Sequence, residues 1–266
     1  VRQRWRTFLS LRVAGEYEGR RFAAEPDTPL VAVCTGCTRR DLVGGSLSLG
    51  LGRAFAGPLS VSAENGFTLS ALLQRREQQG SPRWYNEVRG RAALYLRVPG
   101  PPGFAHSVLA LRLAAGATAG PITKTLGVGG VSSGEVALGF GAYVGTARAF
   151  PVRGYAGSTL RGRRAATMSA EYRVPLALIG KGVGHLPLGA DKMSLSLFGD
   201  AGDAWDPGVQ PRLARLASAG AELVTDVNVN YDFPLRLRLG AAEPIAPLPG
   251  GGRRRVQVYL GFSSDF

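Results

Sequence analysis

The chain has 266 residues, enough to bury a sizeable core, and its 32 Lys and Arg against 19 Asp and Glu give a net charge of +13. Hydrophobic residues make up 45% of the sequence, which excludes a disordered basic tail. The longest stretch without Asp, Glu, Lys or Arg, 98–111, spans 14 residues. A helix needs roughly 20 apolar residues to cross a bilayer, so transmembrane helices are excluded, and the 38 glycines disfavour long helices in general.

Apolar and polar residues alternate along most of the chain, as expected of strands that bury one face. In the last segment, for example, Val256, Val258 and Leu260 alternate with Gln257 and Tyr259. The alternation predicts ten strands, in chain order 5–19, 45–62, 66–78, 87–98, 105–118, 164–178, 192–204, 217–231, 233–243 and 254–266.

The length of these segments indicates the fold class. They are longer than the roughly 5–6 residues of ordinary globular strands and match the ~9–11 residues that a tilted strand needs to cross a membrane. Short and long connections alternate between them, as in barrels with short periplasmic turns and long external loops. The sequence therefore predicts an all-β fold, a transmembrane antiparallel β-barrel. A soluble β-sandwich with a basic binding face also alternates and is the alternative.

The two cysteines, Cys34 and Cys37, form a single Cys-Thr-Gly-Cys in a long predicted loop. A structural zinc site needs two further ligands, and the only histidines lie far away in the sequence. A redox motif is expected between a strand and a helix, whereas a polar loop follows here. A disulfide across an exposed external loop is the favoured interpretation, with free thiols or redox and metal chemistry as alternatives.

Three motifs go beyond the strand pattern. Phe-Pro-Val-Arg-Gly-Tyr occupies 150–155 in the longest predicted loop, Phe-Gly-Asp-Ala-Gly occupies 198–202, and the chain ends in an aromatic-rich strand at Phe266. Together they resemble the bacterial surface antigen family of outer-membrane proteins, which includes the outer-membrane insertase and the transporters of two-partner secretion. The resemblance is clear over 105–266.

The resemblance implies a contact between the loop and the barrel wall. In the family, the tip of this loop, here Val152, Arg153, Gly154 and Tyr155, folds back into the lumen. Its arginine meets an acidic residue in the Phe-x-Asp-x-Gly strand, which here is Asp200 between Phe198 and Gly202, with Glu171 as a possible second carboxylate. Alternation agrees, because it places Asp200 on the polar face of its strand. The resemblance also suggests Tyr259, Phe262 and Phe266 as a C-terminal assembly signal.

Residues 1–266 are expected to form one outer-membrane barrel domain. Family members usually have 16 strands after periplasmic POTRA modules, so either the first part of the barrel and the periplasmic domain are absent here or the chain is a reduced relative. The implied location is the outer membrane of a Gram-negative-type bacterium. The implied function is insertion or translocation of polypeptides there, through a lateral seam between the first and last strands. The alternative is a passive barrel that anchors a periplasmic domain or forms a small pore.

The expected partners follow from the same resemblance. They are outer-membrane lipid and lipopolysaccharide, unfolded outer-membrane or secreted polypeptides, and the assembly machinery for the chain's own insertion. Nucleic acid is not expected, because no aromatic residues interleave with the basic clusters at 161–164 and 253–255. No catalytic residues, cofactor or metal are predicted, since the glycine-rich stretches open no predicted helix and lack a Gly-Lys-Ser/Thr.

Overall fold

A computed structural model describes residues 5–21, 39–131, 134–137, 143–145, 149–182, 188–212, 214–229, 233–247 and 254–263. In this part of the chain no helix is long and apolar enough to cross a membrane. Ten long strands dominate the structure: β1 (Trp5–Arg21), β2 (Arg39–Phe55), β3 (Asn65–Gln78), β4 (Trp84–Val98), β5 (Ser107–Ala119), β10 (Arg164–Gly182), β11 (Leu188–Trp205), β12 (Leu216–Val229), β13 (Phe233–Pro244) and β14 (Gln257–Ser263).

These strands form one antiparallel sheet in the order β1-β2-β3-β4-β5-β10-β11-β12-β13-β14. Because β5 and β10 are neighbours, the segment 120–163 leaves the sheet and returns to it. That segment contributes β7 (Gly134–Ala137), which pairs with β14, and β8 (Tyr143–Gly145), which pairs with β7. Within the described residues β1 pairs with β2 alone, and no pairing joins β1 to β14. The predicted all-β antiparallel architecture is confirmed.

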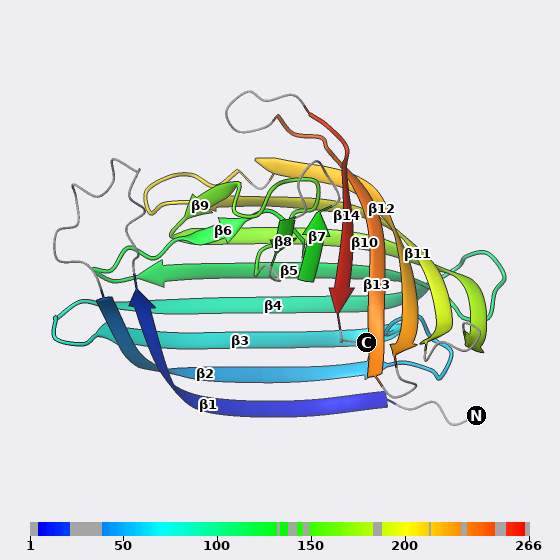
Figure 1. Ribbon diagram of the computed structural model, residues 1–266, viewed down its shortest axis with the longest axis horizontal. Helices are drawn as coiled ribbons and strands as arrows, with labels where there is room; N and C mark the ends of the chain where they lie inside the picture. Colours follow the sequence, from blue (N-terminus) through cyan, green and yellow to red (C-terminus); the bar gives the residue numbers. More distant parts are fainter. Residues whose placement is uncertain are drawn as a thin grey trace.

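The sheet is strongly curled, as Figure 1 shows from the steep course of β13 and β14 relative to β1–β5. One connection proves the curl. The turn 56–64 between β2 and β3 accepts hydrogen bonds at Ser60 O from Lys192 Nζ of β11, at 3.2 Å, and at Val61 O from Arg236 Nη2 of β13, at 3.2 Å. These strands lie at least four places away from β3 in the sheet, so the turn reaches them across the interior. We call the end of the strands where this turn lies the turn end, and the opposite end the loop end.

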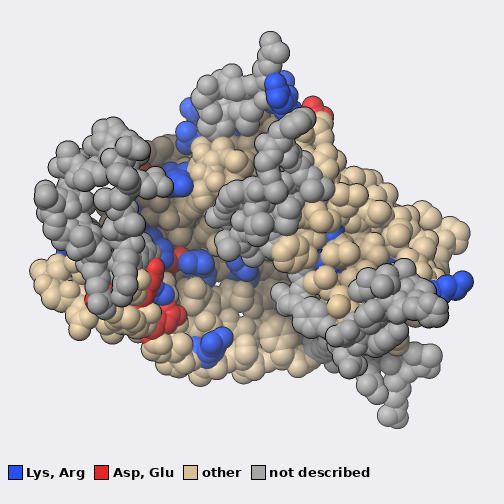
Figure 2. All heavy atoms as spheres, viewed as in Figure 1, with Lys and Arg blue, Asp and Glu red and all other residues tan. Residues whose placement is uncertain are grey.

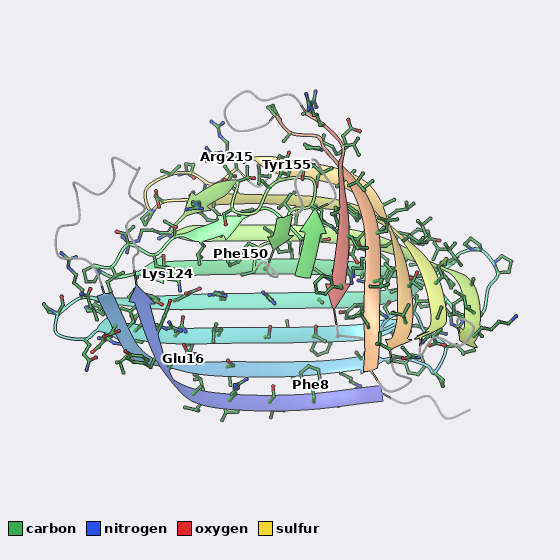
Figure 3. The ribbon with its side chains drawn as sticks, viewed as in Figure 1. Phe8, Glu16, Lys124, Phe150, Tyr155 and Arg215 are labelled. Atoms are coloured by element: carbon green, nitrogen blue, oxygen red, sulfur yellow. The ribbon has the colours of Figure 1, made fainter. Side chains whose placement is uncertain are left out.

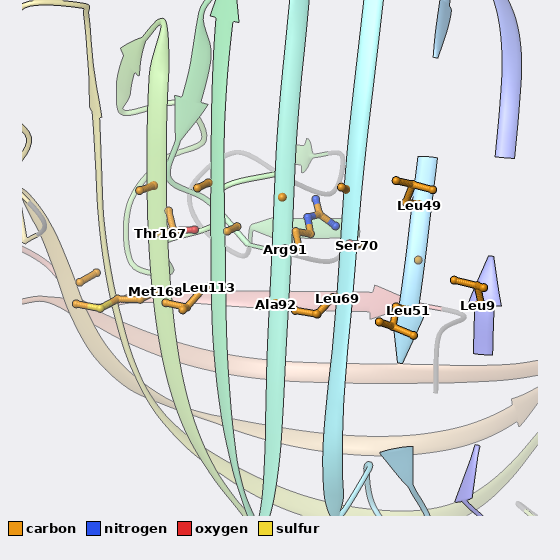
Figure 4. Close-up of a pocket in the computed structure, with 17 residues that line it drawn as sticks. Leu9, Leu49, Leu51, Leu69, Ser70, Arg91, Ala92, Leu113, Thr167 and Met168 are labelled. Atoms are coloured by element: carbon orange, nitrogen blue, oxygen red, sulfur yellow. The ribbon is translucent and has the colours of Figure 1, made fainter. Parts of the chain in front are cut away.

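The two faces of the sheet differ as the alternation predicts. Register joins a continuous apolar row across the outer face, from β1 to β10, which Figure 4 shows: Leu9, Leu51, Leu69, Ala92, Leu113 and Met168. All but Ala92 are large exposed hydrophobic residues, with Leu9 82% exposed. An apolar outer face over a polar inner face is the distribution that a lipid-facing barrel requires.

The described parts of the segment 120–163 lie in the interior of the curl, against β10–β12. Its β6 (Leu126–Val128) and β9 (Leu160–Gly162) form a small sheet of their own, and Figure 3 shows Phe150 and Tyr155 inside the curl. The buried cluster around them joins the segment to the inner face of β10–β12: Leu126, Val128, Phe150, Val152, Tyr155, Leu160, Ala165, Ala204 and Leu216. The lumen therefore holds a hydrophobic core that the returning segment supplies.

Predicted and observed strands differ in extent, most of all at the second strand; the last strand also begins at Gln257 rather than at 254. Alternation at Leu59 and Val61 extended the second strand to residue 62, but β2 ends at Phe55. Pro58 has no N–H to donate to a ladder, and Ser60 N instead bonds Gly57 O at 3.2 Å, so the chain turns here. Cys34, Cys37 and Phe266 lie outside the described residues.

The turn 56–64 is expected to loosen when its contact with β11 is removed. Lys192→Met deletes the two Nζ hydrogen bonds to carbonyl oxygens of Pro58 and Ser60, worth about 1 kcal/mol. Chymotrypsin should then cleave after Leu59 several-fold faster than in the wild type. Lys181→Met, at an exposed lysine on β10, is the matched control, and equal cleavage of the two variants would contradict the expectation.

Candidate functional site

The tip of the returning segment is held against the barrel wall by backbone and packing contacts. Phe150 and Val152 form isolated bridges with Val128 and Gly130, so the tip is anchored on its own segment. Gly154 has φ +84°, a left-handed backbone conformation that residues with a side chain rarely adopt. A Cβ there would also lie 3.2 Å from Ala242 Cβ on β13. Glycine at this position allows the tip to turn directly against the wall.

Arg153 is 5% exposed, and all three nitrogens of its guanidinium contact polar side chains. Its Nε and Nη2 donate to the two carboxylate oxygens of Asp200, each at 2.7 Å, and its backbone N–H also donates to Asp200, at 3.1 Å. Nη2 also reaches Ser169 Oγ at 3.1 Å. Nη1 lies 3.0 Å from Glu171 Oε1 and 3.2 Å from Glu222 Oε1. One arginine therefore contacts carboxylates of β10, β11 and β12, and we call these four charged residues the arginine cage.

An aromatic ring supports the guanidinium from one side. Arg153 Cζ lies 3.5 Å from the centroid of the Phe198 ring, a stacked cation–π contact. Phe198 in turn covers Gly220 on β12, where a Cβ would lie 2.6 Å from Phe198 Cζ. The glycine leaves room for the ring, and the ring fixes the plane in which the guanidinium lies.

Further cations share the carboxylates of the cage. Glu171 also binds Arg112 Nη1 at 2.9 Å and Arg173 Nε at 3.0 Å, while Arg238 Nη1 approaches Glu222 at 3.4 Å. Burial disfavours the charged guanidinium of Arg153, but the hydrogen bonds to Asp200 and the nearby carboxylates outweigh burial and hold the pKa of Arg153 well above its usual range. The site is therefore an ion-pair network in which Arg153 keeps its charge.

Tyr155 extends the contact to the far side of the tip. Its hydroxyl oxygen lies 2.9 Å from Ala217 O and 3.2 Å from Ala246 O, and it accepts a hydrogen bond from Ala217 N at 3.3 Å. Burial raises the pKa of the phenol. On the other side, a Cβ at Gly202 would lie 3.0 Å from Val152 Cγ2, so this glycine leaves space for the tip.

The structure brings together every residue that the loop and strand motifs singled out. Asp200 receives the bidentate contact, and Glu171 is a second carboxylate around Arg153. Glu222 is not among the predicted site residues, although it lies on the polar face of its strand. Alternation places Glu222 in the lumen, but it does not tell which lumen residues of different strands contact the same loop.

The proposed assembly-signal residues separate in space. Tyr259 is buried, faces the lumen and donates its hydroxyl to Glu222 Oε1 at 2.6 Å. Phe262 is 40% exposed on the other face of β14. Tyr259 thus belongs to the surroundings of the arginine cage and connects β14 to it through Glu222.

No known family and no curated protein matches this sequence. Among solved structures, the crystal structure of BamA from Haemophilus ducreyi lacking POTRA domains 1–3 is similar to this chain, with a TM-score of 0.52 and 16% identity. The chain has a BamA-like barrel fold. The similarity covers 96% of this chain and 51% of that chain, so the protein described here spans about half the length of this BamA structure.

Proposed function

We propose that this chain is an outer-membrane barrel of surface-antigen type that inserts or translocates polypeptides at the outer membrane of a Gram-negative-type bacterium. The observation that carries the proposal is the arginine cage, because it fixes a long returning segment inside a lumen by contacts to β10, β11 and β12. The apolar outer face supports the membrane location, and the BamA-like fold supports the class.

The edges of the sheet support an action on other strands. An unpaired N–H or C=O at membrane depth costs several kcal/mol, so a free strand edge there attracts another strand. Within the described residues, the 17 residues of β1 have a partner on one side only, and the other margin, β14, pairs with the short β7 of the returning segment and not with β1. A seam between a free edge and a strand that only a short segment covers suits a barrel that accepts an incoming strand.

Reconstitution tests this proposal. Liposomes containing the purified chain should accelerate the folding of a urea-unfolded eight-stranded outer-membrane protein, read as heat-modifiable gel migration, relative to empty liposomes. Liposomes with an unrelated outer-membrane barrel are the control for bilayer defects. Equal folding rates in the three liposome preparations, together with stable single-channel conductance of the chain, would contradict the proposal and favour the passive pore or anchor.

A further inference from the structure

The inner face of β1–β5 carries positive charge that the described residues do not neutralise. Arg12 of β1 and Arg91 of β4 face the lumen. Followed from strand to strand, the residues paired with each of them end at residues of β10 and β11 that point inward. In the described part of the chain neither has a carboxylate within salt-bridge distance. Both are exposed to the interior, so their charges are accessible.

The neighbours of Arg91 add charge of the same sign. Arg89 precedes it on the same face of β4, and Arg112 lies on the same face of the adjacent β5. Glu87 is already shared by Arg89 and Lys124, and Glu171 is already shared by Arg112, Arg153 and Arg173. A partly enclosed surface with such an excess concentrates anions. Figure 2 shows basic side chains gathered in the hollow of the molecule.

The spacing of the two arginines indicates the size of the anion. Arg12 and Arg91 lie on strands three places apart, which corresponds to roughly 14 Å between backbones. Ser48 is the register partner of Arg12, and Ser70 is the partner of Arg91. Leu72, the partner of Ser48 on β3, also lies between the two cations. Figure 4 shows Arg91 and Ser70 on their adjacent strands. A single inorganic ion does not bridge this span. An extended peptide does, because its alternate side chains are about 7 Å apart.

We propose that the lumen face of β1–β4 binds an extended polypeptide segment bearing carboxylates, with Arg12 and Arg91 as its principal contacts. Arginine suits this role because its planar fork binds carboxylates in bidentate fashion and keeps its charge. The inference deepens the proposed function by assigning a charge to the polypeptide. It is tested by equilibrium binding, so its outcome is separate from that of the insertion assay.

The experiment measures binding of fluorescent ten-residue peptides to the whole detergent-solubilised chain by anisotropy. The probe alternates Glu and Ser, and its neutral counterpart alternates Gln and Ser. We expect the acidic peptide to bind and the neutral one not to bind. The double variant R12Q/R91Q should weaken binding at least tenfold, whereas R83Q/R161Q, which removes two exposed arginines elsewhere, should change it less than twofold.

Two further arms keep the result interpretable. R12K/R91K keeps both charges and should bind within about threefold of the wild type, and heat-modifiable migration verifies that each variant is folded. An equal loss in R12Q/R91Q and R83Q/R161Q would overturn the site in favour of a general effect of net charge. Complete displacement of the peptide by inorganic phosphate at a low millimolar concentration would overturn the polypeptide assignment in favour of a small-anion site.

Discussion

Replacing Arg153 with glutamate is expected to lower the unfolding free energy of the barrel by about 3–5 kcal/mol, the usual cost of leaving buried charges without a partner. The substitution removes the cation that Glu171, Asp200 and Glu222 share and adds a fourth carboxylate among them. It also removes the stacking on Phe198. The returning segment should then leave the wall, and the proposed insertion activity should fall with it.

Urea titration of the folded protein in detergent micelles, followed by heat-modifiable migration, measures this loss. Arg161→Glu makes the same charge change on an exposed arginine of β9 and should leave the midpoint nearly unchanged. Arg153→Lys should fall between the two, because an ammonium keeps the charge but not the bidentate fork. An unfolding midpoint of Arg153→Glu equal to that of Arg161→Glu would disprove a stabilising role for the arginine cage.

The second large effect is expected at Gly240 on β13. Tyr259 is its register partner on β14, and a Cβ at Gly240 would lie 2.4 Å from Tyr259 Cζ. Gly240→Val should displace the ring and break the hydrogen bond from Tyr259 to Glu222. We expect a cost of about 3 kcal/mol, from overpacking together with the lost hydrogen bond. The last strand should detach from the loop tip first.

A double-mutant cycle separates this contact from a general intolerance of valine. All three nearest atoms around a Cβ at Gly240 belong to the side chain of Tyr259, so Gly240→Val should cost less than 1 kcal/mol in a Tyr259→Ala background. Gly199→Val is the control, because a Cβ there has only a contact of 3.9 Å. Additive costs of Gly240→Val and Tyr259→Ala would show that the two residues are not coupled.

Alternation predicted the strands well because one face of each is apolar. It placed Asp200 and Glu171 on the inner face, and the two motifs connected Asp200 with Arg153. Contacts that depend on register or curvature were beyond it. Glu222 and Tyr259 meet because strand register places them in one row, on either side of Gly240, and the period alone does not give the register. The Arg236 contact to Val61 O exists only because the sheet curls.

Local chemistry explains the errors in the turn and the returning segment. Leu59 and Val61 alternate as in a strand, yet Pro58 and the turn at Gly57 stop the ladder. The strands β6 and β9 have three residues each, too few to show a period. Their pairing depends on the core around Phe150, which forms only when the segment lies inside the barrel.

The turn 56–64 has a mechanical consequence for the seam. Its hydrogen bonds from Lys192 and Arg236 connect the β2–β3 hairpin to β11 and β13 across the interior, while β1 and β14 share no ladder in the described residues. The β2–β3 hairpin is thus tethered to the opposite side of the sheet at the turn end by contacts that do not involve a ladder between β1 and β14. These contacts would stay in place if β1 and β14 separated at the loop end.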